Sequence, residues 1–277
     1  MKICLYAPVL MKNFYGEPDF TFKHAKSIGV EAIEIFSTEL KDKTLKEYKS
    51  FAAGYGIDIS GIVCDASMSE KEADKRLAGI DKVKRCVDDA SANNVKRIMV
   101  DPKVKNVGGI SQVRSMEDKI FVRDTICEGL NKIVEYAKGS GVTITLENFS
   151  QHTHPFSTKE EVLYQLKNVP GLKYTLDTGN FYCVKDDVLE AYELLKGYID
   201  NMHLKDWVEY EFGYSIHPNI PVLDGCTMGE GVVPLHELLE RMKADNVFDI
   251  DCILELNTIE ITKNDVEQST NFIKKYL

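Results

Sequence analysis

Four short apolar segments in the second half of the chain each end in, or beside, a side chain that can bind a metal ion or move a proton. In chain order these side chains are Glu147, Asp177, His203 and Glu255. Three carboxylates and one imidazole suit a divalent cation of harder character, Mn²⁺ first and Mg²⁺, Co²⁺ or Zn²⁺ as alternatives. A lone glutamate at a strand end is more often solvated or capping a helix. The hypothesis therefore depends on the fold bringing the four together.

The rest of the chain predicts elements that would do this. Apolar runs of strand length alternate with amphipathic segments of helical periodicity. Eight strands are expected, at residues 2–7, 30–36, 57–64, 96–100, 142–147, 173–177, 199–204 and 250–256. Eight helices are expected, at residues 20–28, 40–54, 70–93, 117–138, 158–167, 186–195, 234–244 and 265–276. The stretch 207–233, with four glycines and two prolines, is expected to be irregular.

Such regular alternation predicts an α/β fold, a (β/α)8 TIM barrel formed by a single domain over residues 1–277. The alternative is an open, doubly wound sheet. That sheet more often has a glycine-rich phosphate-binding turn after its first strand, and Ala7-Pro8-Val9-Leu10 is not one. In a barrel the carboxyl ends of all strands meet on one face, which carries the active site. The four residues would then converge from four consecutive strands.

Composition narrows the class of protein. The formal net charge is −10 and the pI is about 5.2, which argues against binding nucleic acid through its phosphates. No apolar run is long enough to span a bilayer, and the N-terminus does not resemble a signal peptide. The seven cysteines are scattered, without a C-x-x-C pair, as expected for reduced thiols. We therefore expect a cytoplasmic protein without a nucleic-acid or membrane partner.

Five short motifs carry a family resemblance that covers essentially the whole chain. They are Leu146-Glu147-Asn148, Leu176-Asp177-Thr178-Gly179, His203-Leu204-Lys205-Asp206, Gly229-Glu230-Gly231 and Leu254-Glu255. In this order they resemble the xylose isomerase-like TIM barrels, which include sugar and sugar-phosphate isomerases and epimerases, inosose dehydratase-like proteins and endonuclease IV (AP endonuclease family 2). The resemblance implies that Glu147, Asp177, His203 and Glu255 hold one divalent metal ion. It also implies a small-molecule carbohydrate substrate, and relatives are often dimers or tetramers.

The activity that this resemblance implies is a metal-dependent sugar isomerase or epimerase acting through a metal-stabilised enediolate. In that branch Glu147 and Glu255 also serve as the catalytic acid and base. One would remove the α-proton and the other would return it from the opposite side of the substrate. The alternatives are a metal-dependent dehydratase or lyase of the inosose dehydratase type, an endonuclease IV-like nuclease, and a binding protein without turnover. The acidic charge and the small number of histidines argue against the nuclease.

Four further residues are predicted to contact the substrate. Asn180 stands where many relatives have a histidine, three residues after the aspartate, and it can hydrogen-bond a hydroxyl but cannot move a proton. Lys205 shares a strand face with His203 by period two and can stabilise an oxyanion or hold a hydroxyl. His152 lies in the loop after Glu147, and Glu34 lies on the second strand. Because Asn180 replaces this histidine, the sequence does not determine the branch of the family or the sugar.

Overall fold

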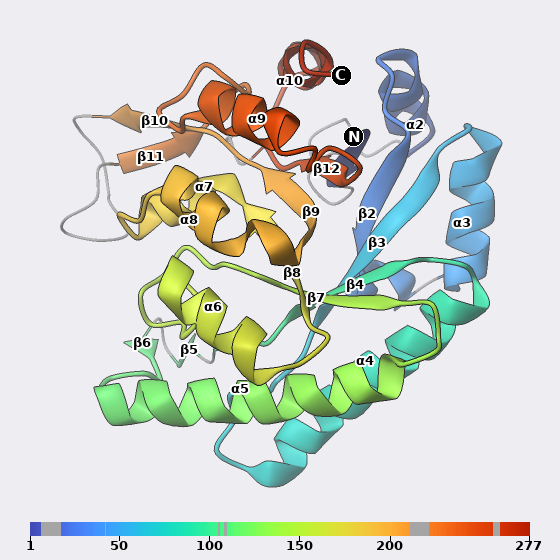
Figure 1. The fold of residues 1–277 in the computed structure, drawn as a ribbon. Coiled ribbons are helices and arrows are strands. Elements are labelled where there is room, and N and C mark those ends of the chain that lie inside the picture. The colour runs from blue at the N-terminus through green and yellow to red at the C-terminus, as the bar shows by residue number, and fades with distance from the viewer. Residues whose placement is uncertain (7–17, 42, 105, 108–109, 211–221, 257–260) are drawn as a thin grey trace.

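Eight parallel strands form a closed barrel in the computed structural model, which describes residues 1–6, 18–41, 43–104, 106–107, 110–210, 222–256 and 261–277. The strand order around the barrel is β1-β12-β9-β8-β7-β4-β3-β2. The strands are β1 (Lys2–Tyr6), β2 (Ala32–Phe36), β3 (Asp58–Asp65), β4 (Arg97–Asp101), β7 (Thr143–Glu147), β8 (Lys173–Asp177), β9 (Ile199–Leu204) and β12 (Asp251–Leu254). Helices surround them on the outside (Figure 1). The predicted (β/α)8 barrel is confirmed.

The outer helices lie where the periodicity predicts them, with ends that differ by a few residues. They are α2 (Pro18–Ser27), α3 (Leu45–Gly54), α4 (Ala73–Ala92), α5 (Met116–Ala137), α6 (Lys159–Asn168), α8 (Val188–Leu195), α9 (Leu235–Ala244) and α10 (Lys263–Lys274). The predicted start at residue 40 is wrong. A short 3₁₀ helix, η1 (Ser37–Lys41), comes first, and α3 begins only after Thr44. Thr44 and Glu47 form a reciprocal capping box, which fixes that start.

The start of α6 differs from the prediction by one residue. Thr158 is the N-cap, and Glu161 completes a capping box with it. The Ser157 hydroxyl is used elsewhere, since it donates to the backbone oxygens of Gln151 and His154. These bonds fold the 148–157 loop back on itself beside the end of β7.

Three small elements were not predicted from the sequence. The helix α7 (Thr178–Cys183) follows β8 directly, and the Asp177 side chain caps it. Two antiparallel hairpins join β5 (Asn106–Val107) to β6 (Ile110–Ser111) and β10 (Trp207–Tyr210) to β11 (Val222–Gly225). The stretch 207–233 is therefore not wholly irregular. Its two strands are only four residues each, too short for their alternation to stand out among the glycines.

Along β7, β8 and β9, side-chain alternation separates an apolar outer core from polar residues inside the barrel, whereas Cys4, Ala32 and Ile253 on β1, β2 and β12 form a small apolar cluster of their own. Ile144, Leu146, Tyr174, Leu176, Met202 and Leu204 are buried in the main apolar core. The intervening residues on the same strands are polar. Thr175 Oγ1 lies 2.8 Å from Thr145 Oγ1 and 2.7 Å from Asn201 Oδ1. Residues two positions further along each strand point the same way at its carboxyl end.

Among the described helices, none is long and apolar enough to cross a bilayer.

Candidate metal and proton-transfer site

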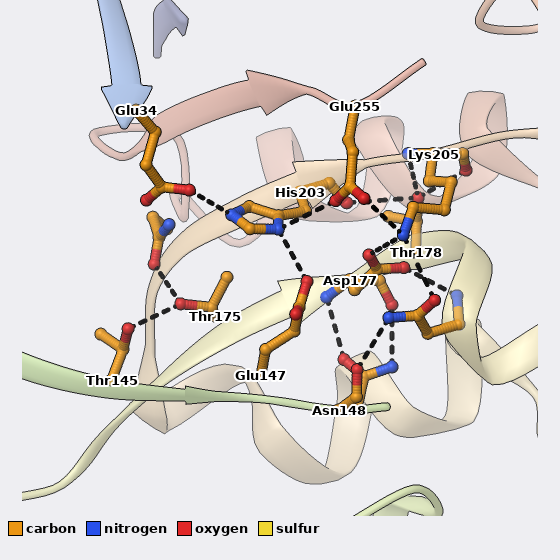
Figure 2. A network of polar contacts seen from close by, with 12 residues as sticks. Glu34, Thr145, Glu147, Asn148, Thr175, Asp177, Thr178, His203, Lys205 and Glu255 are labelled. Atoms are coloured by element: carbon orange, nitrogen blue, oxygen red, sulfur yellow. Dashed lines mark hydrogen bonds and ion pairs between the residues drawn. The ribbon is translucent and has the colours of Figure 1, made fainter. Parts of the chain in front are cut away.

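The barrel brings together the four side chains singled out from the sequence. Glu147 is the last residue of β7, Asp177 ends β8, His203 lies near the end of β9, and Glu255 directly follows β12. Asp177 and His203 are register partners, and His203 pairs in turn with Ile253. One ligand atom from each of the four lies within 4.8 Å of the others (Figure 2).

The atoms that face one another in this cluster lack ordinary hydrogen bonds. His203 Nδ1 lies 2.7 Å from Glu147 Oε1 and 3.2 Å from Glu255 Oε2. Yet His203 Nδ1, Glu147 Oε1 and Asp177 Oδ2 are all buried without a hydrogen-bond partner of normal geometry. Such atoms are costly inside a protein unless something else satisfies them. Their convergence fits a bound cation, and the donor set of three carboxylates and an imidazole fits a divalent one.

Lys205 supplies the positive charge nearest to the cluster. Its Nζ lies 2.8 Å from Asp177 Oδ2 and 3.0 Å from Glu255 Oε1, and it donates to Asn180 Oδ1 at 3.3 Å. The side chain is buried, and these carboxylates raise its pKa despite the opposing effect of burial. Lys205 is therefore held as an ammonium group against two of the predicted ligands.

The pKa shifts reflect a site with more buried carboxylates than cations. Burial raises the pKa of Asp177 to about 7, although Lys205 opposes this shift. Burial also favours the neutral form of Glu255, but Lys205 and His203 outweigh it and lower the pKa to about 2. Burial alone would lower the pKa of His203, and the carboxylates of Glu147 and Glu34 instead raise it well above its ordinary value. A divalent cation would offset this excess of negative charge.

Glu34 reaches the cluster from the far side of the histidine ring. Its Oε2 lies 2.8 Å from His203 Nε2, the nitrogen that points away from Glu147 and Glu255 (Figure 2). Glu34 is fully buried. This geometry favours a role in holding His203 over the substrate contact predicted from the sequence.

Asn180 belongs to a network with Asn148, a residue for which no separate role was predicted. Asn180 Nδ2 donates to the backbone oxygen of Asn148 at 2.9 Å, and its Oδ1 accepts from Lys205. Asn148 accepts from the backbone N–H of Asp177 at 2.9 Å and from the Tyr174 hydroxyl at 2.6 Å. Both ends of the Asn180 amide are thus used within the protein. Its predicted contact with substrate stays a prediction, and the geometry favours a positioning role.

The two histidines of the loop after β7 have different surroundings. The side chain of His152 is exposed, and its backbone oxygen accepts from Lys119 Nζ at 2.7 Å. His154 is buried and stacks on Phe149, with ring centroids 4.4 Å apart. The substrate contact predicted for His152 stays a prediction. In the contacts described, His154 packs within the loop.

Tyr6 is a site residue that the sequence reasoning missed. It is the last residue of β1, and its ring lies 5.6 Å from the His203 ring and 5.0 Å from that of Phe36. Burial and the neighbouring carboxylates, with Glu255 and Glu147 first, raise the pKa of its phenol well above the usual value. Its position at the carboxyl end of a strand could have identified it as a candidate site residue.

Asp206 fixes the loop beside the site rather than pairing with Lys205. Its two oxygens accept from four backbone N–H groups, those of Trp207, Gly229, Gly231 and Val233, at 2.9–3.1 Å. A side chain at Gly231 would collide with this carboxylate. Gly231 of the Gly229-Glu230-Gly231 motif therefore follows from close backbone approach to Asp206. Gly229 has a positive φ of 85°, and a side chain there would collide with Phe272.

Comparisons with known proteins agree with this architecture. No curated protein matches the chain in sequence. Three similar solved structures are an IOLI protein with a bound zinc atom (17% identity, TM-score 0.77, 100% of this chain and 98% of that one), a D-tagatose 3-epimerase-like protein (21%, 0.76, 100% and 97%), and the probable 3-DHS dehydratase AsbF from Bacillus anthracis (16%, 0.75, 99% and 99%). At these identities they show the fold alone. A family model described as xylose isomerase-like TIM barrel matches residues 22–276. The chain therefore belongs to the xylose isomerase-like TIM barrel family.

Proposed function

We propose that the protein is a divalent-metal-dependent isomerase or epimerase of a sugar or sugar phosphate, acting by proton transfer between substrate carbon and two glutamates. One observation carries the proposal. Of the four clustered side chains, Asp177 and His203 are sealed, at 0% and 1% exposure, whereas Glu147 and Glu255 are each 12% exposed. The two glutamates are therefore the members that a substrate can reach.

The residues that would hold the metal ion are Glu147, Asp177, His203 and Glu255. When bound, the ion would polarise a substrate carbonyl and its neighbouring hydroxyl, which makes the adjacent proton more acidic. The chain supplies the proton acceptor and donor. A carboxylate oxygen of one glutamate takes the proton from the carbon next to the carbonyl, and the other glutamate returns a proton to the resulting enediolate. Return to the same carbon from the opposite face gives an epimer, whereas return to the neighbouring carbon gives an isomer.

Three neighbouring side chains would hold the two glutamates and the other predicted ligands in place: Lys205, Asn180 and Asn148. Lys205 holds Glu255 and Asp177 at 3.0 and 2.8 Å, so that neither carboxylate can turn away. Asn148 joins the carboxyl ends of β7 and β8 through its bonds to Asp177. Several proteins of similar structure are epimerases or epimerase-like, which is consistent with this class of reaction.

The direct test is solvent exchange. The purified protein is assayed for its metal content and then incubated in D₂O with a panel of ketoses, inososes and their phosphates. We expect one carbon-bound deuterium in substrate or product, lost on chelation and restored by Mn²⁺. Glu147→Gln and Glu255→Gln should each lower turnover roughly 10²–10⁴-fold, whereas the exposed Glu160→Gln should not. Full metal loading and turnover without deuterium uptake would contradict the proposal.

A second candidate, a dehydratase, is favoured by one contact. The Lys205 ammonium lies 3.0 Å from Glu255, so an acid stands beside a base. Glu255 can take a proton from carbon while Lys205 protonates a departing hydroxyl, which releases water and leaves a double bond. A new conjugated absorbance with those substrates would identify this reaction, because isomerisation and epimerisation conserve the number of hydroxyls and carbonyls.

A further inference from the structure

Glu34 contacts the one ring nitrogen of His203 that the metal-facing carboxylates do not. Glu34 Oε2 lies 2.8 Å from Nε2, whereas Glu147 and Glu255 face Nδ1. A neutral imidazole has one N–H and one lone pair, and an ionised carboxylate can only accept. In the neutral ring that a metal ion requires, Glu34 can accept only from an N–H at Nε2, which leaves the lone pair on Nδ1, directed into the cluster.

A local irregularity of the barrel gives Glu34 its place. Its neighbours Ile33 and Ile35 pack in the outer core, so alternation turns Glu34 into the barrel. The register with β3 shifts at this point, from Ile33–Ile59 to Glu34–Gly61. Such bulges re-aim side chains next to active sites. Here the extra residue, Ser60, lies in β3, so the bulge makes Gly61 the residue that stands opposite Glu34.

Gly61, the residue opposite Glu34, leaves the room that its carboxylate occupies. A Cβ at position 61 would lie 3.0 Å from Glu34 Oε1 and 3.4 Å from Arg97 Cβ, closer than side-chain carbons normally approach. The glycine and the bulge together make a compartment for one carboxylate group at the back of His203. Any larger residue at position 61 would push the carboxylate towards the ring or away from it.

The fold by itself gains little from this carboxylate. Its second oxygen, Oε1, is buried without a hydrogen-bond partner, and the residue is fully buried. A buried carboxylate with one unsatisfied oxygen is unfavourable compared with a neutral residue of the same shape. What Glu34 does supply is a fixed orientation of the histidine ring. Carboxylates that accept from the distal N–H of a metal-binding histidine have this effect in metal sites generally.

We propose that Glu34 is a positioning residue that fixes the tautomer and ring orientation of His203 so that Nδ1 can bind a divalent metal ion. The inference rests on the metal site proposed above. It assigns Glu34 to the metal through His203 and not to the substrate. It also assigns Gly61 and the bulge in β3 to the same task.

The test separates metal affinity from stability. The affinity for Mn²⁺ is measured by titration calorimetry on metal-free wild type, Glu34→Gln and Glu31→Gln, the last at an exposed glutamate just before β2. Glu34→Gln should weaken Mn²⁺ binding about 10–100-fold, because an amide can donate as well as accept and no longer fixes the tautomer. The melting temperature of the metal-free variant should stay the same or rise. Glu31→Gln should change neither quantity, and Gly61→Ala should weaken Mn²⁺ binding.

Two results would overturn the inference, and they differ from each other. If Glu34→Gln binds Mn²⁺ as wild type does and only its melting temperature falls, Glu34 has a structural role alone, and the metal site still stands. If wild type itself does not bind Mn²⁺ or another divalent ion, the metal site fails and the inference fails with it. The visible spectrum of bound Co²⁺, which reports ligand geometry, should change in Glu34→Gln and not in Glu31→Gln.

Discussion

Charged side chains are buried at both ends of this barrel, but the two groups are built differently. At the amino end Arg97 Nε lies 2.7 Å from Asp200 Oδ2, and its NH1 lies 3.1 Å from Asp251 Oδ2 and 3.4 Å from the Ser60 backbone oxygen. Arg97 is the first residue of β4 and Asp251 the first of β12. The guanidinium therefore ties β4 to β3, β9 and β12 near the starting points of these strands.

At the carboxyl end the charges are not balanced in the same way. Four carboxylates, those of Glu34, Glu147, Asp177 and Glu255, meet one ammonium group and one imidazole, and several of the facing atoms lack hydrogen bonds. Burying charges that are not fully paired costs stability, so such an arrangement needs a reason other than folding. In TIM barrels the amino-end face serves stability and the carboxyl-end face serves catalysis. In this barrel the buried charges are paired at the amino end and in excess at the carboxyl end, as this division of roles predicts.

The largest effect is expected when one predicted ligand is removed at the carboxyl end. Asp177→Asn keeps the shape but removes a charge from the sealed side of the cluster. We expect the affinity for Mn²⁺ to fall by more than the roughly 10–100-fold typical of a residue that only supports a ligand. We also expect metal-free stability to stay the same or increase, since fewer like charges are buried together. Calorimetric titration and thermal unfolding of the metal-free protein check the two halves, and a variant that loses stability but keeps its metal would contradict the assignment.

The converse change is made at the amino end. Arg97→Met leaves Asp200 and Asp251 without their shared cation. Breaking a fully buried pair costs about 3–5 kcal/mol, and the loss here should be smaller because the two carboxylates are 26% and 20% exposed. Urea unfolding at neutral pH measures this loss. The folded fraction should still bind Mn²⁺ with wild-type affinity, because the ligands stand at the other end of the strands. A large loss of metal affinity with little loss of stability would show that the two ends are not independent.

A buried aspartate within the carboxyl end gives a third, smaller contrast. Asp206 follows β9 closely, yet its carboxylate is fully used by backbone N–H groups. Asp177 instead accepts from the Asn180 N–H with Oδ1 and turns Oδ2 to the Lys205 ammonium, 2.8 Å away, in the cluster. Asp206→Asn should cost about 2 kcal/mol, because an amide offers one accepting oxygen in place of two and its NH₂ faces donors. Metal affinity should be nearly unchanged. Asp224→Asn is the matched control in β11, where the aspartate accepts from the Gly225 N–H alone in the contacts described.

The sequence predicted the barrel and the convergence of the four side chains because both follow from position along a strand. Apolar alternation located the strands, and Glu147, Asp177 and Glu255 stand at or just beyond their ends. The partners of these residues depend on packing between strands distant in sequence. Glu34 and His203 are 169 residues apart, and their contact needs a bulge in β3 that periodicity does not reveal. The pairing of Arg97 with Asp251 could have been predicted from the sequence. Each is a charged residue at the first position of a buried strand, and the amino ends of parallel strands meet at one face of a barrel.

His203 and His154 are both buried, yet their pKa values shift in opposite directions. Carboxylates raise the pKa of His203, whereas burial among the aromatic rings of the 148–157 loop, helped by Lys103 and Lys119, lowers the pKa of His154 to about 4. A histidine that is held neutral contributes stability above its unfolded pKa of about 6.5, and that contribution is lost as the pH falls towards 4.

Between pH 6.5 and 5.5 the loss from His154 should be about 1 kcal/mol, since one pKa unit corresponds to about 1.4 kcal/mol. Urea unfolding at the two pH values measures it. His154→Phe, which can keep the stacking on Phe149, should show a correspondingly smaller fall in stability than wild type over this interval. His152→Phe, two residues away with an exposed side chain, should follow wild type. Equal pH dependence in wild type and His154→Phe would mean that His154 is not held neutral, and the contrast between the two histidines would fail.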